Sequence, residues 1–314
     1  MKLLTIGMSL LFFGFIADLS ASPEKNGFDL SNSLIPGHKI LSGGPNRDGI
    51  PAINHPKFLK SGERIVLQPD HRILGMTYQG ISKAYPIKIL NHHEIVNDQF
   101  AGEPVVITFC PLCGSGIAYS ARIAEKTLHF GVSGLLYNSD VLLFDRETES
   151  LWSQLMNQAI SGSMREKRLV QLAITHTTWQ DWHKRFPDTL VLSEETGYYR
   201  DYSQNPYKDY RLDKKIWFPV EQQSKRYHPK EMVMGIEING QFKAYPFSEL
   251  AKNKAEINDQ LAGKNYSIQY DPLHQTASVT DNNGKELPTV LTFWFAWYAF
   301  HPEALIYQIP VSKM

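Results

Sequence analysis

Apolar and polar residues alternate in two separate segments of the chain, and both segments predict the same elements. Each starts with alternating residues around a glycine, Gly80 or Gly240, which is typical of a β-hairpin. Pro86 and Pro246 then predict the start of a short helix, because proline is tolerated in the first helical turn. In the first segment the strand-forming run "PVVITF" follows. The pattern therefore predicts hairpin, helix and strand, twice.

The two segments also share identical residues in register. Ala84-Tyr85-Pro86 recurs 160 residues later as Ala244-Tyr245-Pro246, and Asn97-Asp98-Gln99 recurs 161 residues later as Asn258-Asp259-Gln260. One inserted residue reconciles the two spacings. Several identities in a short window indicate an internal duplication, and the repeat is too widely spaced for a solenoid.

The remaining segments have less regular patterns. Residues 22–70 are rich in glycine and proline, which predicts an irregular N-terminal arm. We expect residues 71–229 to form a first lobe with a long insertion, and residues 230–314 to form a second lobe. The chain has neither a glycine-rich phosphate loop nor the regular βαβ alternation of a nucleotide-binding fold. The predicted fold class is α+β, dominated by strands, with duplicated hairpin, helix and strand lobes.

The first residues predict export. Lys2 precedes an apolar run from Leu3 to Ala17 and then small residues, so residues 1–21 are typical of a secretory signal peptide cleaved near Ala21. This run is shorter than the ~20 residues of a comfortable membrane span, and no later run is as apolar for as long. We expect a periplasmic or secreted protein without an integral span in the mature chain. An uncleaved N-terminal anchor is the alternative.

The charge balance narrows the classes of partner. Lysine and arginine total 32, aspartate and glutamate total 32, and the formal net charge is zero. A nucleic-acid-binding protein would show a basic excess or basic runs, and a peripheral membrane protein would show a basic amphipathic helix. The sequence shows neither pattern. We therefore predict a metal ion or a small molecule as the partner and no nucleic acid, and the sequence leaves open whether a protein also binds.

Candidate chemistry centres on "FCPLCGSG", which contains the only two cysteines of the chain, Cys110 and Cys113. Two thiolates from one tight turn can chelate a single ion, and soft thiolates favour copper or zinc. The pair is only half of a tetrahedral site. A helix that starts after Pro86 would turn His93 inward with its apolar face, so His93 is the expected third ligand. The leading hypothesis is a copper or zinc site formed by Cys110, Cys113 and His93.

The same cysteine pair is compatible with two other functions. C-x-x-C is the usual spacing of a redox dithiol, so an extracytoplasmic thiol–disulfide oxidoreductase is one alternative. Gly114 and Gly116 disfavour the helix that commonly activates such thiols. The other alternative is a non-enzymatic binding or scaffold protein with a structural disulfide, whose short loop would give only modest stabilisation.

The second copy replaces both thiols. Asp271 aligns with Cys110 and His274 with Cys113, and both pairs enclose Pro-Leu. A metal site tolerates such a change of ligand by changing the preferred metal, whereas a disulfide does not. The alternative is that Pro-Leu only shapes a turn and that the second copy lost the function of the first. We retain Asp271 and His274 as candidate pocket residues.

A dense polar run follows the next predicted strands. From it we expect Asn138, Asp140 and Trp152 to line a pocket, and His129 in a preceding strand is a further ligand candidate. If Asp140 and Glu149 faced each other, they could act as an acid–base pair of a hydrolase. The competing interpretation is a β-hairpin with "YNSD" as its turn.

Five motifs in this order resemble a bacterial family known as domain of unknown function 3179: "FCPLCGSG", "FGVSGLLYNSD", "DRETESLWSQ", "DTLVLSEETGYYRDY" and "FWFAWYAFHP". The resemblance covers most of the mature chain, from "SGGPNRDGIPA" onward. It implies an exported or membrane-attached bacterial protein, and it implies no established reaction, cofactor or catalytic residue. The function must therefore be argued from the residues themselves.

Overall fold

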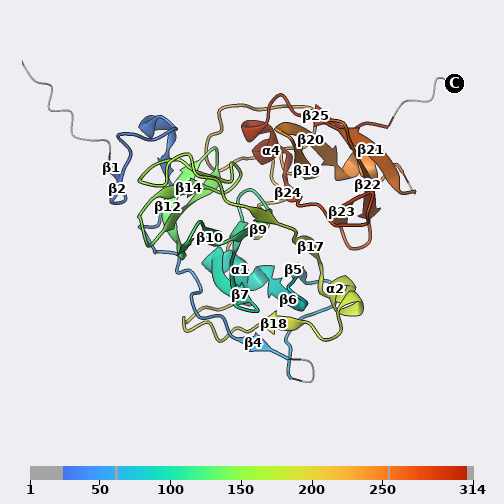
Figure 1. Cartoon of the computed structure of the whole chain (residues 1–314), viewed down its shortest axis with the longest axis horizontal. Coiled ribbons are helices and arrows are strands. Elements are labelled where there is room, and N and C mark those ends of the chain that lie inside the picture. The colour runs from blue at the N-terminus through green and yellow to red at the C-terminus, as the bar shows by residue number, and fades with distance from the viewer. Residues whose placement is uncertain (1–23, 61–62, 254, 310–314) are drawn as a thin grey trace, which may run out of the picture.

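The structure, a computed structural model, describes residues 24–60, 63–253 and 255–309, and the predicted signal peptide lies outside them. Strands dominate this part of the chain, which confirms the β-dominated fold class (Figure 1). The helices are short: the 3-10 helix Gly37–Lys39, α1 (Ile87–His93), α2 (Trp179–Arg185), α3 (Phe247–Leu250) and α4 (Trp294–Phe300). Among the described residues no helix has the length and apolar character needed to cross a membrane.

We call residues 72–192 unit 1. Unit 1 contains a hairpin sheet and a three-stranded meander. Its strands are β5 (Arg72–Tyr78), β6 (Ile81–Pro86), β7 (Ile95–Phe100), β8 (Glu103–Cys110), β9 (Ser115–Ser120), β17 (Thr175–Thr178) and β18 (Leu190–Leu192). The hairpin sheet has the order β17-β5-β6-β18, with β18 parallel to β6, and β4 (Phe58–Leu59) adds an edge strand. The antiparallel meander consists of β7, β8 and β9.

Residues 232–306 have the same order of elements, and we call them unit 2. Its strands are β19 (Met232–Ile238), β20 (Gln241–Pro246), β21 (Ile257–Leu261), β22 (Lys264–Asp271), β23 (Thr276–Asp281), β24 (Val290–Phe293) and β25 (Leu305–Ile306). The hairpin sheet has the order β24-β19-β20-β25, with β25 parallel to β20, and β21, β22 and β23 form the meander. Helices α2 and α4 hold the same place, between the last two strands of their units.

A glycine in each hairpin allows a helix to pack closely on it. A Cβ atom at Gly75 would lie 2.3 Å from the indole ring of Trp182, and one at Gly235 would lie 2.0 Å from the ring of Trp297. Both distances are too short for any side chain other than hydrogen. Each helix is therefore fixed to its own hairpin by the same glycine–tryptophan contact.

The two units interlock. β24 of unit 2 pairs with β9 of unit 1 through Leu291 and Gly116, so that one sheet runs β25-β20-β19-β24-β9-β8-β7, with β16 (Gln171–Leu172) attached to β9. There is a second contact between the units, because β23 of unit 2 lies beside β17 of unit 1 (Figure 1). The meander of each unit therefore contacts the hairpin sheet of the other.

The insertion of unit 1 and the N-terminal arm form a third sheet, with the order β15-β14-β13-β12-β3. Its strands are β3 (Leu41–Ser42), β12 (Phe130–Tyr137), β13 (Asp140–Asp145), β14 (Leu151–Ser153) and β15 (Gln158–Ala159). Two small ribbons complete the strands: β1 (Glu24–Lys25) with β2 (Phe28–Asp29), and β10 (Arg122–Ile123) with β11 (Lys126–Thr127). β3 ties the arm to the insertion.

Candidate metal centre

Cys110 and Cys113 lie in the turn that joins β8 to β9. Cys110 ends β8, and Gly114, with a positive φ of 63°, turns the chain so that Ser115 can begin β9. Phe293 of unit 2 packs against this turn, because a Cβ atom at Gly114 would lie 2.9 Å from its ring. Both cysteines are free thiols, and their side chains are buried in the same hydrophobic cluster.

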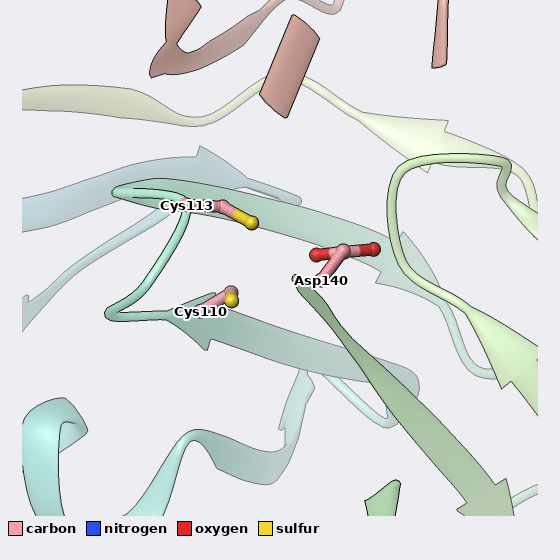
Figure 2. A group of neighbouring side chains, drawn as sticks. All are labelled: Cys110, Cys113 and Asp140. Atoms are coloured by element: carbon pink, nitrogen blue, oxygen red, sulfur yellow. The ribbon is translucent and has the colours of Figure 1, made fainter. Parts of the chain in front are cut away.

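Asp140 brings a carboxylate to the two thiols. One ligand atom from each of Cys110, Cys113 and Asp140 lies within 4.8 Å of the other two, and Figure 2 shows the carboxylate pointing toward the space between the sulfur atoms. We call these three residues the cysteine group. Asp140 begins β13 directly after the turn residues Asn138 and Ser139, whose φ angles of 51° and 67° are those of a two-residue hairpin turn. The predicted "YNSD" turn therefore positions the carboxylate.

The three side chains have few hydrogen-bond partners. The main-chain oxygen of Ser139 is the acceptor for both thiols, at 3.9 Å from Cys110 Sγ and 3.4 Å from Cys113 Sγ. Asp140 Oδ2 accepts a hydrogen bond from the N–H of Leu155 at 3.0 Å, whereas Asp140 Oδ1 is buried without a partner. A buried carboxylate oxygen without a donor is energetically unfavourable. Oδ1 is thus available to a further ligand.

Burial disfavours the ionised forms of all three side chains of the cysteine group. Burial raises the pKa of both thiols above the ordinary value, and the neighbouring Asp140 adds to the rise. Burial also raises the pKa of Asp140 to about 7. Loss of solvation disfavours the charged forms, so that a nearby positive charge is needed to stabilise them.

Glu94 is a fourth acid beside the cysteine group. It caps the C-terminus of α1 with a positive φ of 58°, its side chain is buried, and its main-chain oxygen accepts from the N–H of Phe109 at 2.7 Å. Phe109 directly precedes Cys110, which places Glu94 next to the cysteine turn. Burial, and then Asp140, raise the pKa of Glu94 to about 8. The one sequence signal was a glutamate at a helix end where glycine or asparagine is usual.

The structure brings Asp140, not His93, to the cysteines. His93 does lie on the buried face of α1, as the helical spacing predicts. Its Nδ1 donates to the oxygen of Pro51 at 2.7 Å, and its Nε2 accepts from the hydroxyl of Tyr202 at 2.7 Å. Burial lowers the pKa of His93 to about 4, which agrees with a neutral ring. Both ring nitrogens are thus occupied, and His93 is outside the ligand groups found among the described residues.

Two other predicted pocket residues also have their own partners. His129 is half exposed, and its Nδ1 lies 2.7 Å from Glu147 Oε1 in an ion-pair arrangement. Trp152 is fully buried, and its indole N–H donates to Asp145 Oδ2 at 2.8 Å. His129 is therefore part of a surface pair, and Trp152 is part of the hydrophobic core.

Glu149 does not face Asp140. It follows the opposite end of β13, its side chain is 62% exposed, and it forms an ion pair with Arg47 at 2.7 Å. Asp140 begins β13 and is buried. An acid–base pair of these two carboxylates would need them on the same side of one substrate, which this arrangement does not provide.

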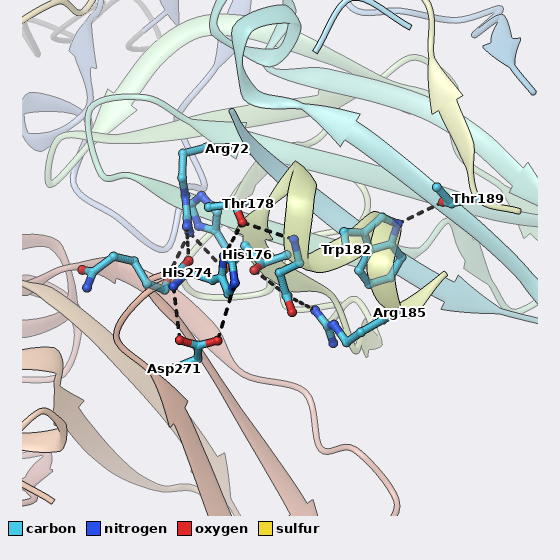
Figure 3. A network of polar contacts seen from close by, with 11 residues as sticks. Arg72, His176, Thr178, Trp182, Arg185, Thr189, Asp271 and His274 are labelled. Carbon is cyan, nitrogen blue, oxygen red and sulfur yellow. Dashed lines mark hydrogen bonds and ion pairs between the residues drawn. The ribbon is translucent and has the colours of Figure 1, made fainter. Parts of the chain in front are cut away.

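The corresponding turn of unit 2 joins the two units (Figure 3). His274 Nδ1 lies 2.7 Å from Thr178 Oγ1 at the end of β17. Arg72 of unit 1 donates to the main-chain oxygens of His274 and Gln275. The N–H groups of Leu273 and His274 turn back to Asp271 Oδ1. Asp271 and His274 thus shape and anchor a turn between the units.

Asp181, Asp271 and His274 also bring ligand atoms within 4.8 Å of one another, and all three are half-buried. Asp181 Oδ2, however, already accepts from Thr177 Oγ1 at 2.7 Å and from the guanidinium of Arg185 at 2.6 Å. The arginine supplies positive charge where a metal ion would otherwise do so. This group is therefore satisfied by protein atoms to a greater extent than the cysteine group.

Residues 205–221, which we call the cover segment, pack beside the turn that carries Asp140. Tyr210 of this segment is buried in the same hydrophobic cluster as both cysteines. Ser139 Oγ donates to the oxygen of Phe218 at 3.2 Å, and Asn138 Oδ1 accepts from the N–H of Glu221 at 2.8 Å. The predicted pocket residue Asn138 therefore fastens the cover segment beside Asp140.

A family model described as protein of unknown function (DUF3179) matches residues 47–304. Comparison with curated proteins and with solved structures gave no match. The matched range includes unit 1 with its insertion, the cysteine group, the cover segment and unit 2 as far as residue 304. The chain, as its motifs predicted, belongs to the DUF3179 family.

Proposed function

We propose that this protein binds a zinc ion through Cys110, Cys113 and Asp140. The observation that carries the proposal is the meeting of two buried thiols with the unpartnered Oδ1 atom of Asp140. Thiolate sulfur and carboxylate oxygen are both ordinary zinc ligands. Cu(I) prefers soft sulfur ligands to carboxylate oxygen, so Asp140 favours zinc over copper.

The negative charge of the cysteine group, when its three side chains are ionised, favours the binding of a cation. Two thiolates and a carboxylate together carry three negative charges, and burial disfavours each of them. A bound Zn²⁺ ion offsets two of these charges and deprotonates coordinating thiols outright. Zinc uptake should therefore release protons and contribute to the stability of the folded chain.

A thiol–disulfide enzyme is less well supported. Reactive dithiols are partly exposed and have a lowered pKa. Here Cys110 is 1% exposed and Cys113 is fully buried, and burial raises the pKa of both thiols. The strand β9, and not a helix, follows the pair. The activating features of a redox dithiol are therefore missing at this turn.

We infer that the residues before the described range direct export. As a separate inference, the two units are copies of one ancestral unit. The order of strands, the glycine–tryptophan contact and a lysine–aspartate–tyrosine group support the duplication. This group is made of Lys83, Tyr85 and Asp98 in unit 1 and of Lys243, Tyr245 and Asp259 in unit 2. The copies then differ in their turns, since unit 1 has the cysteines and unit 2 has Asp271 and His274.

Metal analysis of the purified protein tests the zinc proposal. The protein is isolated from the periplasm without chelators, and its metal content and intact mass are measured. We expect about one zinc ion per chain, none in Cys110→Ser/Cys113→Ser, and zinc affinity reduced by at least about tenfold in Asp140→Asn. The matched control is Asp271→Asn, in the corresponding turn of unit 2, which should retain the ion.

Three results would contradict the proposal. A metal-free protein whose mass is two protons lower than that of the dithiol would show a disulfide instead of a metal site. Zinc lost in Asp271→Asn but kept in Asp140→Asn would place the ion in unit 2. Copper in place of zinc would retain the ligands and overturn the choice of metal.

A further inference from the structure

Resting on the proposed zinc site, we propose that the ion has a fourth coordination position for an exchangeable neutral oxygen ligand, which accepts a hydrogen bond from Tyr210. Zinc sites with four protein ligands are structural, whereas sites with three protein ligands and an exchangeable ligand are typical of catalysis. The cysteine group supplies three ligands. The ligand class is water at rest, replaced by a small molecule with a carbonyl or hydroxyl oxygen.

Tyr210 is the first observation that points to such a ligand. Its side chain is 3% exposed, and its hydroxyl is buried without a hydrogen-bond partner. Burial raises the pKa of Tyr210, and the nearby Cys113 and Cys110 add to the rise, so that the hydroxyl remains protonated and able to donate. A buried O–H group without an acceptor is unfavourable. An oxygen ligand on the ion would provide the missing acceptor.

The position of Tyr210 is fixed against the cysteine turn. Its ring lies 6.5 Å from that of Phe293, whose N–H donates to the oxygen of Cys113 at 2.7 Å. Trp217 packs at 4.6 Å from the ring, and the ammonium group of Lys230 lies 3.9 Å from the ring centroid. The tyrosine is thus held by aromatic and cation–π contacts, and the main-chain N–H of Trp217 faces its hydroxyl oxygen as a donor and not as an acceptor. The O–H group is therefore still available to donate to a ligand.

The charge of the site selects a neutral ligand. Zinc with two thiolates and one carboxylate has a net charge of minus one, and the site is buried. A further anion would increase an unfavourable buried charge, whereas water, a carbonyl or an alcohol adds none.

Glu94 is the competing occupant of the fourth position. Its side chain is buried and interacts electrostatically with Asp140 and Cys110. Its carboxylate is nevertheless outside the group of ligand atoms within 4.8 Å of one another. A second carboxylate on the ion would also add the negative charge that a neutral ligand avoids. The experiment must therefore distinguish Glu94 from a solvent-derived ligand.

The test uses the full protein loaded with Co²⁺. The absorption spectrum and the electron paramagnetic resonance spectrum of the bound Co²⁺ show which ligands coordinate it. We expect thiolate-to-cobalt charge transfer in the absorption spectrum and line broadening of the resonance in water enriched in oxygen-17. Acetamide, a neutral carbonyl probe, should displace this water. The carbonyl stretch of bound acetamide, read by isotope-edited infrared difference spectroscopy, should shift to higher frequency in Tyr210→Phe, because the variant removes one hydrogen bond to the carbonyl oxygen. Tyr266→Phe, in unit 2, is the control and should not change it.

Each other outcome has a distinct meaning. Cobalt bound without oxygen-17 broadening, with broadening restored in Glu94→Gln, would show Glu94 as the fourth ligand and overturn this inference but not the zinc site. Broadening present, with the carbonyl stretch of bound acetamide unchanged in Tyr210→Phe, would overturn the role of Tyr210. Absence of thiolate-to-cobalt charge transfer would overturn the proposed function itself.

Discussion

Lys83 and Asp98 form a buried ion pair that has a more exposed counterpart elsewhere in the chain. The side chains of Lys83 and Asp98 are 8% and 4% exposed, and those of Lys243 and Asp259 are 14% and 17% exposed. Asp98→Ala would leave the lysine charge buried and unpaired, so we expect the free energy of unfolding to fall by about 3–5 kcal/mol. Asp259→Ala should cost less, because solvent reaches Lys243. Urea unfolding of both variants checks this, and equal losses would contradict it.

His93 predicts a loss of stability in acid. Its pKa is about 4 in the folded protein against 6.5 when exposed, so the unfolded chain takes up a proton first as the pH falls. The contribution of neutral His93 is complete above about pH 6.5 and decreases as the pH falls toward about 4. His93→Gln keeps a donor for Pro51 and an acceptor for Tyr202 without titrating.

We therefore expect the urea midpoint of the wild type to fall more steeply between about pH 7 and pH 5 than that of His93→Gln. His176 and His301, whose pKa values burial also lowers, remain in both proteins and cancel in the comparison. Parallel curves for the two proteins would show that His93 is not neutral and buried in the folded state.

The residue patterns predicted which side chains face the interior, but not which residues they contact there. The helical spacing correctly turned His93 inward, yet the space it enters is occupied by Pro51 and Tyr202. The true neighbour of the cysteines, Asp140, comes from a strand of the insertion. A contact between segments so far apart depends on packing, and local periodicity has no information on it.

At the scale of elements, the turn between β12 and β13 controls the candidate site. Ser139 has a φ of 67°, which glycine adopts freely and β-branched residues adopt only with strain. Ser139→Gly and Ser139→Val both remove the hydrogen bond to Phe218. We expect Ser139→Val to lower zinc affinity by at least about tenfold and Ser139→Gly to retain it within about threefold, because only valine distorts the turn that positions Asp140.

Competition with a chromophoric zinc chelator measures both affinities. Equal losses in the two variants would assign the effect to the Phe218 hydrogen bond and not to the backbone of the turn.

The elements of the two hairpins were predictable because alternation, a glycine turn and a proline helix start occur together in each. The relation of α2 to α4 was not predicted, although "TTWQDWHKRFP" and "TFWFAWYAFHP" both place tryptophans opposite a hairpin glycine. The insertion changes the spacing between hairpin and helix in unit 1, which hides the match from a search at one fixed offset. Only the packing of Trp182 and Trp297 on Gly75 and Gly235 reveals it.

At the scale of the whole molecule, the strand-rich fold class followed from composition and pattern, and the interlocking of the units did not. β9 pairs with β24, and the N–H of Phe293 and the hydroxyl of Thr292 both donate to the oxygen of Cys113. Pairing between segments this distant in sequence is decided by the fit of the packed sheets, for which a single sequence gives no signal.

That exchange of contacts has a consequence for how such a protein can change over time. Because unit 2 holds the turn that contains Cys113, and unit 1 holds the turn that contains His274, neither half can be deleted, shortened or transplanted without loosening the other. A gene that arose by doubling would normally leave a spare copy free to diverge or disappear. Here neither unit is spare, because each supplies a hydrogen-bond partner to a turn of the other, and we expect both to be retained.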